Sequence, residues 1–382
     1  MNIVKENAPH LRRKATVTRM MVDVLIALAP TLIFSFIVYP INTLVTYAIS
    51  VFIMLASEFV FIGLTHMFPN DGVKRTFKEK FSHAYKGTFT QNNFLSAAIS
   101  AVIFTLIMPV AMKLPDGSII PPIYPAIVGS LVGIVLGKLV FGGLGQNIFN
   151  PAVLGMIVAK ICFGSSYVYY IDNWFFKLPD TIADATPLGL INDGALSNIN
   201  QFQPFDMFFG RIPGTLGEVY KITILIGLIY LLVRRSADFR IVVSYLGTFF
   251  VLSLVAGLSL LGLGTGVNPF SFVLYSLLSG GVLFGATFML TDPVTSPINS
   301  PSRVIYGMVA AVMTVFIRLF AALPEGVGFS ILIANMVAVV LDHYEWSNPR
   351  FSWKNILIMV SIGVLSALIV FIVLMFGGVY NG

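Results

Sequence analysis

Residues 141–152 read F-G-G-L-G-Q-N-I-F-N-P-A, and residues 284–297 read F-G-A-T-F-M-L-T-D-P-V-T-S-P. Each stretch joins the glycine-containing end of an apolar segment to an Asn-Pro or Asp-Pro pair, so the two form a weak internal repeat. Glycine- and proline-interrupted membrane segments at matching places in two halves of a chain point to a binding site between the halves. The pair therefore predicts a membrane bundle of two repeats with a central site.

The composition identifies a polytopic membrane protein. Hydrophobic residues make up 57% of the 382 residues and charged residues only 10%, whereas soluble domains carry about 25% charge. The first 19 residues are polar and basic and are followed by a full-length apolar run, so no cleavable signal is evident. Basic loops account for the net charge of +6, and we expect no nucleic-acid partner.

We expect eleven membrane-spanning helices, because a span needs roughly 20 apolar residues. The apolar segments lie near residues 20–39, 42–64, 94–112, 123–141, 151–164, 219–233, 240–259, 270–290, 303–321, 328–341 and 355–376. The fifth, sixth and tenth are short, which is typical of broken or re-entrant helices that line a protein interior.

The basic residues predict the orientation, because Lys and Arg are enriched in cytoplasmic loops. They concentrate before the first span, in the 65–93 loop and in the 234–240 turn. With alternating spans all three places fall on one side, so the N-terminus is expected inside. The resulting divisions are a cytoplasmic segment 1–19, a membrane repeat 20–164, an extracytoplasmic loop 165–218, a second repeat 219–345 and an additional C-terminal helix within 346–382.

The first motif offers a place for a planar ligand. Gly142, Gly143 and Gly145 allow close approach of the backbone to such a ligand, or tight contact between helices. The side-chain amides of Asn147 and Asn150 need hydrogen-bond partners at membrane depth. A ligand site and a packing corner are both compatible with this pattern.

Carboxylates lie at the expected cytoplasmic ends of two spans. Asp292 belongs to the second motif, and Asp342 follows the tenth span. Each either attracts a cation or caps the next element, and capping is the commoner role of an Asp-Pro turn. Glu218 closes a G-T-L-G-E run, which suits a cofactor edge or the start of a helix.

Ionisable residues within membrane spans are costly to bury, so each of them is a candidate for a functional role. Glu58 and Arg318 are expected to lie deepest and to pair with charges on this chain or on a neighbour. Lys138 is expected to extend to the cytoplasmic interface, and Asp23 to lie too shallow to contribute. The single cysteine, Cys162, is expected to be a small buried side chain.

Metal and disulfide chemistry find little support in the sequence. One cysteine excludes an intrachain disulfide and a four-cysteine iron–sulfur cluster built by this chain alone. The four histidines show no metal-ligand spacing, so we expect no metal site.

Several motifs together resemble a known family. In order they are F-G-G-L-G-Q-N-I-F-N-P-A (141–152), A-T-P-L-G (185–189), G-T-L-G-E (214–218), T-D-P-V-T-S (291–296), P-E-G (324–326) and I-L-I-A-N-M with L-D-H (331–343). Over roughly residues 10–345 the chain resembles the D subunit of the Rnf complex and the B subunit of the sodium-pumping NADH:quinone reductase. G-G-L-G-Q-N and the short N-terminal segment favour the Rnf subunit, whereas L-P-E-G and L-D-H are closer to the quinone reductase subunit.

The resemblance implies a fold and two flavins. The fold is an all-α polytopic, urea-transporter-like bundle of two five-helix repeats, to which the eleventh helix is an addition. FMN is joined through its phosphate to Thr186 by an FMN transferase, with Asp180 and Ala185 in the same motif. A riboflavin is held non-covalently in the membrane part. The family's Ser-Gly before Ala-Thr is replaced here by Ala183 and Asp184, which alters the turn presented to the transferase.

The resemblance also implies a function. It assigns cation uptake to Asp292 and Asp342, and it places the chain in the bacterial inner membrane. The chain would act, together with membrane and peripheral partner subunits, in a ferredoxin:NAD+ oxidoreductase or an NADH:quinone reductase that moves Na+ or H+, and would not be catalytic alone. The absence of a Rossmann fingerprint indicates that it does not bind NAD(H). A urea-transporter-like solute channel without a redox role and a membrane scaffold without flavin stay open as alternatives.

Overall fold

The computed structural model describes residues 16–66, 76–85, 90–169, 175, 203–321, 326–343 and 350–376. Most of these residues are helical, and the chain is a polytopic membrane protein. The expected flavin-attachment motif, with Asp180, Ala185 and Thr186, lies outside the described residues, so its role stays a prediction.

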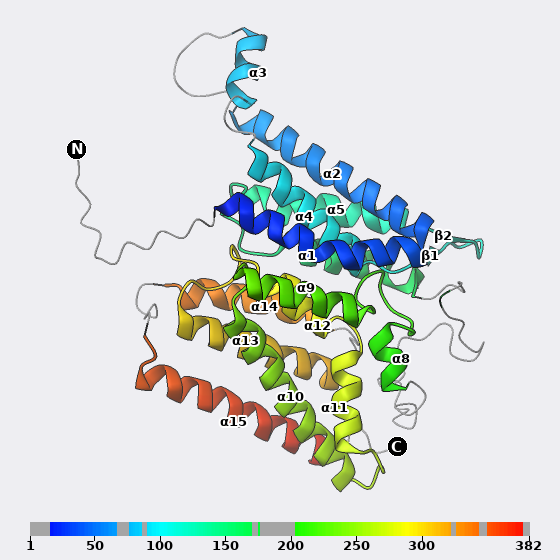
Figure 1. Cartoon of the computed structure of the whole chain (residues 1–382), viewed down its shortest axis with the longest axis vertical. Coiled ribbons are helices and arrows are strands. Elements are labelled where there is room, and N and C mark those ends of the chain that lie inside the picture. The colour runs from blue at the N-terminus through cyan, green and yellow to red at the C-terminus, as the bar shows by residue number, and fades with distance from the viewer. Residues whose placement is uncertain are drawn as a thin grey trace.

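The two halves of the chain occupy two halves of the molecule (Figure 1). The helices of the first half are α1 (Val17–Val38), α2 (Pro40–His66), α3 (Phe77–Tyr85), α4 (Gln91–Ile107), α5 (Ile123–Gly137) and α6 (Pro151–Phe163). Those of the second half are α8 (Pro204–Phe209), α9 (Lys221–Arg234), α10 (Phe239–Gly262), α11 (Pro269–Leu278), α12 (Val282–Phe284), the π-helix η4 (Gly285–Met289), α13 (Ser300–Phe320), α14 (Gly326–Leu341) and α15 (Trp353–Phe376).

The predicted spans all coincide with helices, but not all of these helices cross a membrane alone. Within the described residues six are long and apolar enough, or seven if α11 and the α12–η4 segment count as one bent span. The helices α4, α6, α9 and α14 have only 17, 13, 14 and 16 residues. The short helix α6 contacts α4 and α14, while α9 contacts α1 and α12. Short or broken helices of this kind occur in membrane proteins where they are buried among other helices.

The eighth span, expected to be continuous over 270–290, is broken. The axis of α11 and that of the α12–η4 segment differ in direction by 61°. Gly280, between them, has a φ of +59°, a conformation that glycine adopts without steric penalty. The break is therefore built into the backbone at residues 279–281, which read S-G-G, although the surrounding apolar run predicted a continuous span.

A small antiparallel sheet supplements the helices. Its strand order is β2 (Ile119–Ile120), β1 (Ala111–Lys113) and β3 (Tyr167–Val168), with Met112 opposite both Ile120 and Tyr167. The third span, expected to reach residue 112, consequently ends at Ile107. Pro109 explains the early end, because a proline disfavours helical backbone at the residue before it.

Helix contacts repeat between the two halves. In the first half α2 packs against α4 and α5, and α5 against α6; in the second half α10 packs against α11 and α13, and α13 against α14. The halves meet where α1 packs against α9 and α6 against α14. The additional helix α15 packs on α10 and α13 and stays largely exposed.

Three single-residue expectations were wrong. Asp23 is buried and accepts hydrogen bonds from Tyr230, Arg234 and Ser236, so it ties α1 to the end of α9. Lys138 does not extend to an interface but is buried, because its ammonium pairs with the buried Glu58 carboxylate. Cys162 is exposed on the bundle surface.

Candidate functional site

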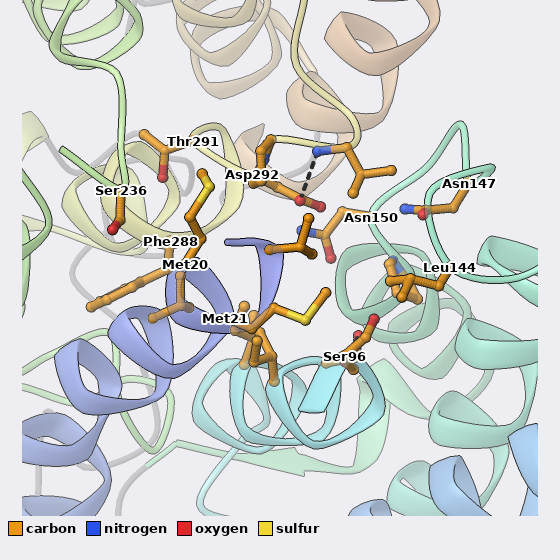
Figure 2. A pocket seen from close by; sticks show the side chains of 18 of the residues that line it. Met20, Met21, Ser96, Leu144, Asn147, Asn150, Ser236, Phe288, Thr291 and Asp292 are labelled. Carbon is orange, nitrogen blue, oxygen red and sulfur yellow. Dashed lines mark hydrogen bonds between the residues drawn. The ribbon is translucent and has the colours of Figure 1, made fainter. Parts of the chain in front are cut away.

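A cavity of about 480 Å³ lies between the two halves, at the end of the bundle where α1 and α4 begin. Figure 2 shows side chains from both halves surrounding this space. Its walls come from α1 (Val17, Met20, Met21, Val24), α4 (Asn92, Ser96, Ile99, Ser100, Ile103), the segment after α5 (Lys138, Leu144, Gly145, Asn147, Asn150, Pro151), the end of α9 and its turn (Leu231, Ser236, Ala237) and the end of η4 (Thr287, Phe288, Thr291, Asp292, Pro293, Val294). The two sequence motifs therefore meet at one cavity.

The first motif forms its wall through a left-handed turn. Gly142, Gly143 and Gly145 have φ values of +112°, +92° and +84°, which strain any residue with a side chain. The turn delivers Asn147 and Asn150 to the cavity, whereas Gly142 and Gly143 do not line it. Asn150 also caps α6, because its Oδ1 accepts from the Ala152 N–H at 3.1 Å. The cap fixes this side chain at the cavity wall.

The second motif contributes the opposite wall through the π-helix. Phe288 and Thr287 come from η4, and Asp292 follows it (Figure 2). The Asp292 carboxylate accepts from the Val294 N–H at 3.1 Å and from the Thr295 hydroxyl at 3.4 Å. Burial raises the pKa of Asp292, while these hydrogen bonds and the Lys138 ammonium lower it. A single π-helical turn within helices is frequent at functional sites.

One residue of the cavity wall, Lys138, belongs to a buried ion pair. Lys138 Nζ donates to both Glu58 carboxylate oxygens at 2.8 Å, and both side chains are only 1% exposed. Asn93 Nδ2 adds a third hydrogen bond to this carboxylate at 3.1 Å. The sequence left open whether Glu58 pairs with a charge on this chain or on a neighbour. Its partner is Lys138 of the same chain.

Two further predicted site residues within the described part of the chain, Asp342 and Glu218, lie outside the cavity wall. Asp342 accepts from the Ile298 N–H at 3.0 Å, so it ties the end of α14 to the loop that follows Asp292. Burial raises the pKa of Asp342, and this hydrogen bond and Arg303 oppose the increase. Glu218 accepts from the Thr215 hydroxyl at 3.0 Å, in a separate cluster at the start of α9.

A second, more polar cavity of about 630 Å³ adjoins the first. The two share Met20, Ser236, Ala237, Thr291 and Pro293. The lining of the second cavity includes three arginines and one aspartate: Arg235, Arg240, Arg303 and Asp238. Arg240 and Arg303 form ion pairs with the Asp238 carboxylate. The first cavity therefore has a positively charged neighbour.

The first cavity has the composition of a ligand site. Pockets for small molecules measure about 300–1,000 Å³ and combine apolar walls with a few convergent polar groups. Here Met20, Met21 and Phe288 supply apolar surface, and Asn150 and Asp292 supply polar groups (Figure 2). Sequence reasoning missed the contributions of α1 and α4, because ordinary apolar spans carry no signal of the surface they share.

Comparison with known proteins adds independent information. A model of the NQR2, RnfD, RnfE family matches residues 4–350. The D subunit of the Na+-translocating ferredoxin:NAD+ oxidoreductase complex of Acetobacterium woodii is 28% identical over 347 residues, which cover 90% of this chain and 94% of that protein. The D subunit of the proton-translocating ferredoxin:NAD+ oxidoreductase complex of Clostridium ljungdahlii is 29% identical over 350 residues, 88% and 93% of the two chains. The B subunit of the Na+-translocating NADH-quinone reductase of Chromohalobacter salexigens is 34% identical over 250 residues, 64% and 57% of the two chains.

Proposed function

Because the chain belongs to the NQR2, RnfD, RnfE family, we propose that it is the membrane flavoprotein subunit of an Rnf-type ion-translocating oxidoreductase complex. Similarity to the ferredoxin:NAD+ oxidoreductase subunit covers 90% of the chain, against 64% for the quinone reductase subunit, which supports the Rnf type. The relatives include both Na+- and proton-translocating complexes, so either cation is compatible with this function. Its place is the bacterial inner membrane, with the N-terminus in the cytoplasm.

The proposed architecture is a urea-transporter-like bundle of two five-helix repeats. The first repeat comprises α1, α2, α4, α5 and α6. The second comprises α9, α10, the broken α11–α12–η4 segment, α13 and α14. The matching helix contacts within the two halves support this division. A ligand site between two such repeats is the usual arrangement in repeat-built transporters.

The cavity where the two motifs meet is the observation that carries the proposal. Its volume and apolar walls suit a planar ring system, and its position between the halves suits a ligand that affects both. We assign it to a non-covalent riboflavin, held by packing against Met20, Met21 and Phe288 and by polar contact with Asn147 and Asn150. A bound flavin supplies the ability to take up and release electrons singly or in pairs.

Coupling of electron transfer to cation movement is energetically adequate. Moving one elementary charge against 100 mV requires about 2.3 kcal/mol. A one-electron redox difference of similar voltage provides that energy. Asp292 lines the cavity and Asp342 binds the loop after it, so both carboxylates are placed to respond to charge in the cavity.

Filling the cavity is expected to remove the non-covalent flavin. Ser96 of α4 lines the cavity (Figure 2), and Ser96→Trp would occupy space that the ring system needs. We expect at least a tenfold loss of flavin released by acid precipitation of the purified complex. Phe94→Trp is the matched control, because Phe94 lies on the same helix and is 48% exposed. Undiminished release from Ser96→Trp would refute the assignment of this cavity.

The covalent flavin is proposed to be FMN on Thr186, installed by an FMN transferase. The chain, co-expressed with that transferase, should fluoresce under ultraviolet light on a denaturing gel. Thr186→Val should abolish the band, because the hydroxyl that forms the phosphoester is gone. Thr181→Val, at the neighbouring threonine, should leave it intact. A dark band from the unaltered complex would favour the scaffold or the solute channel, which solute flux through the isolated chain would then separate.

A further inference from the structure

A second group of buried charges lies away from the cavity, around the break between α11 and α12. Glu218, Lys221 and Arg318 are 7%, 0% and 7% exposed. They come from the loop before α9, the start of α9 and the last turn of α13. Burying an ionisable side chain at membrane depth costs free energy, so such a residue is a candidate for a functional role. The proposed flavin site does not use this group.

The two cations bind backbone oxygens at the helix break. Lys221 Nζ donates to the Gly280 carbonyl at 2.9 Å and to the Glu218 carbonyl. Arg318 donates to the Ser276 carbonyl at 2.8 Å and to the Ser279 carbonyl at 3.3 Å. The last carbonyls of a helix have no backbone partners within that helix, and at the end of α11 positive side chains hold them.

The Glu218 carboxylate lies against the same break. A Cβ at Gly281 would overlap Glu218 Oε1, so an alanine there would have to push this carboxylate aside. The Thr215 hydroxyl fixes the other carboxylate oxygen, Oε2, at 3.0 Å. The carbonyl oxygens of Glu218 and Gly280 thus converge on the Lys221 ammonium, and the Glu218 carboxylate lies at the same break, beside Gly281.

Such a set of oxygens is what a transported monovalent cation requires. In transporters with discontinuous helices, unwound carbonyls and helix C-terminal ends coordinate Na+ or H+. We infer that Glu218 and the carbonyls of residues 218 and 280 form a monovalent cation site, and that the Lys221 ammonium is a tethered occupant which the transported cation displaces. This inference rests on the cation translocation of the proposed function.

The broken segment connects this site to the cavity. Gly280 lies at the break, and the next residues form α12 and the π-helix, whose Phe288 lines the cavity. Displacing Lys221 from the Gly280 carbonyl changes a contact at one end of this short segment, while a ligand in the cavity contacts its other end. One element therefore touches both sites, so a change in its arrangement would alter both of them.

The test compares Na+ binding by variants of the full chain in its purified complex. The measured quantity is the apparent Kd for Na+, obtained from the shift of the thermal unfolding midpoint at constant ionic strength with choline chloride. Lys221→Met should lower this Kd at least tenfold, because no tethered cation competes. Adding Glu218→Gln to Lys221→Met should remove the saturable shift, and Lys221→Arg should behave like the unaltered chain.

A glycine pair provides a second test that keeps every charged residue. Gly281→Ala pushes the Glu218 carboxylate out of place and should raise the Kd for Na+ at least tenfold, in the Lys221→Met background and in the unaltered chain. Gly247→Ala is the matched control, because a Cβ there meets nothing within 4 Å. This pair decides the question even if Lys221→Met does not fold.

The outcomes separate this inference from the proposed function. An unchanged Kd in Lys221→Met, no saturable Na+ effect in that variant, or equal effects of Gly281→Ala and Gly247→Ala would overturn the cation site. Flavin content is measured on the same preparations. Normal flavin with unaltered Na+ binding refutes only the cation site, whereas absent flavin with the expected Na+ response refutes only the flavin assignment.

Discussion

Glu58→Ala is expected to destabilise the chain by about 3–5 kcal/mol, because removing one partner of a buried ion pair leaves the other charge uncompensated. The Lys138 ammonium is 1% exposed and would lose both of its 2.8 Å bonds to the carboxylate. The free energy of unfolding in mixed detergent–lipid micelles measures the effect. Since Lys138 also lines the cavity, retained non-covalent flavin should fall in parallel.

Two controls accompany this prediction. The double variant Glu58→Met with Lys138→Met should recover most of the lost stability, because apolar replacement of a buried pair is often neutral or stabilising. Asp206→Ala removes one partner of an exposed pair, Arg211–Asp206 at 3.9 Å, and should change stability by no more than about 1 kcal/mol. A loss below that size for Glu58→Ala, or a double variant less stable than the single one, would contradict the argument.

Gly155→Ala is expected to force α5 and α6 apart. A Cβ at Gly155 would overlap the Gly129 carbonyl oxygen and lie 3.2 Å from the Gly133 Cα. Both obstacles are backbone atoms, so a side-chain rotation cannot relieve the clash. Overpacking of this kind costs about 1–3 kcal/mol, occasionally more. Asn150 caps α6 and lines the cavity, so displacing α6 should also move Asn150. We therefore expect the complex to retain less non-covalent flavin.

The matched control for this change lies at the end of the same helix. A Cβ at Gly164 would have only the Lys160 Cγ in its vicinity, at 3.5 Å, which is ordinary contact. Gly164→Ala should therefore leave the unfolding midpoint and the flavin content unchanged. If the two alanine variants had the same unfolding midpoint and the same flavin content, the close contact of α5 with α6 would contribute to neither.

Local features were predictable from the sequence. Each apolar segment that was predicted as a span contains a helix. Apolar runs are a good guide here, because a helix that crosses the hydrocarbon core needs about 20 apolar residues. The three glycines of the first motif have the left-handed backbone that only glycine adopts at no cost. The interpretation of the two repeated motifs as parts of one central site also agrees with their meeting at one cavity.

Long-range partners could not be predicted in this way. Glu58 and Lys138 are 80 residues apart, and Asp23 and Ser236 are 213 residues apart. A single sequence shows that each of these residues is polar in an apolar run, but not which helix will face it. Lys138 and Asp23 were therefore placed wrongly, although their segments were correctly assigned.

The sequence by itself determined that this is a membrane bundle of apolar helices, since hydropathy and helix ends depend on residues close in the chain. Only the tertiary structure decided which side chains enclose the cavity and which carbonyl oxygens accept hydrogen bonds from Lys221. The reason is physical: a lipid-facing and a protein-facing apolar helix have nearly the same composition, and the surfaces that distinguish them are created by packing.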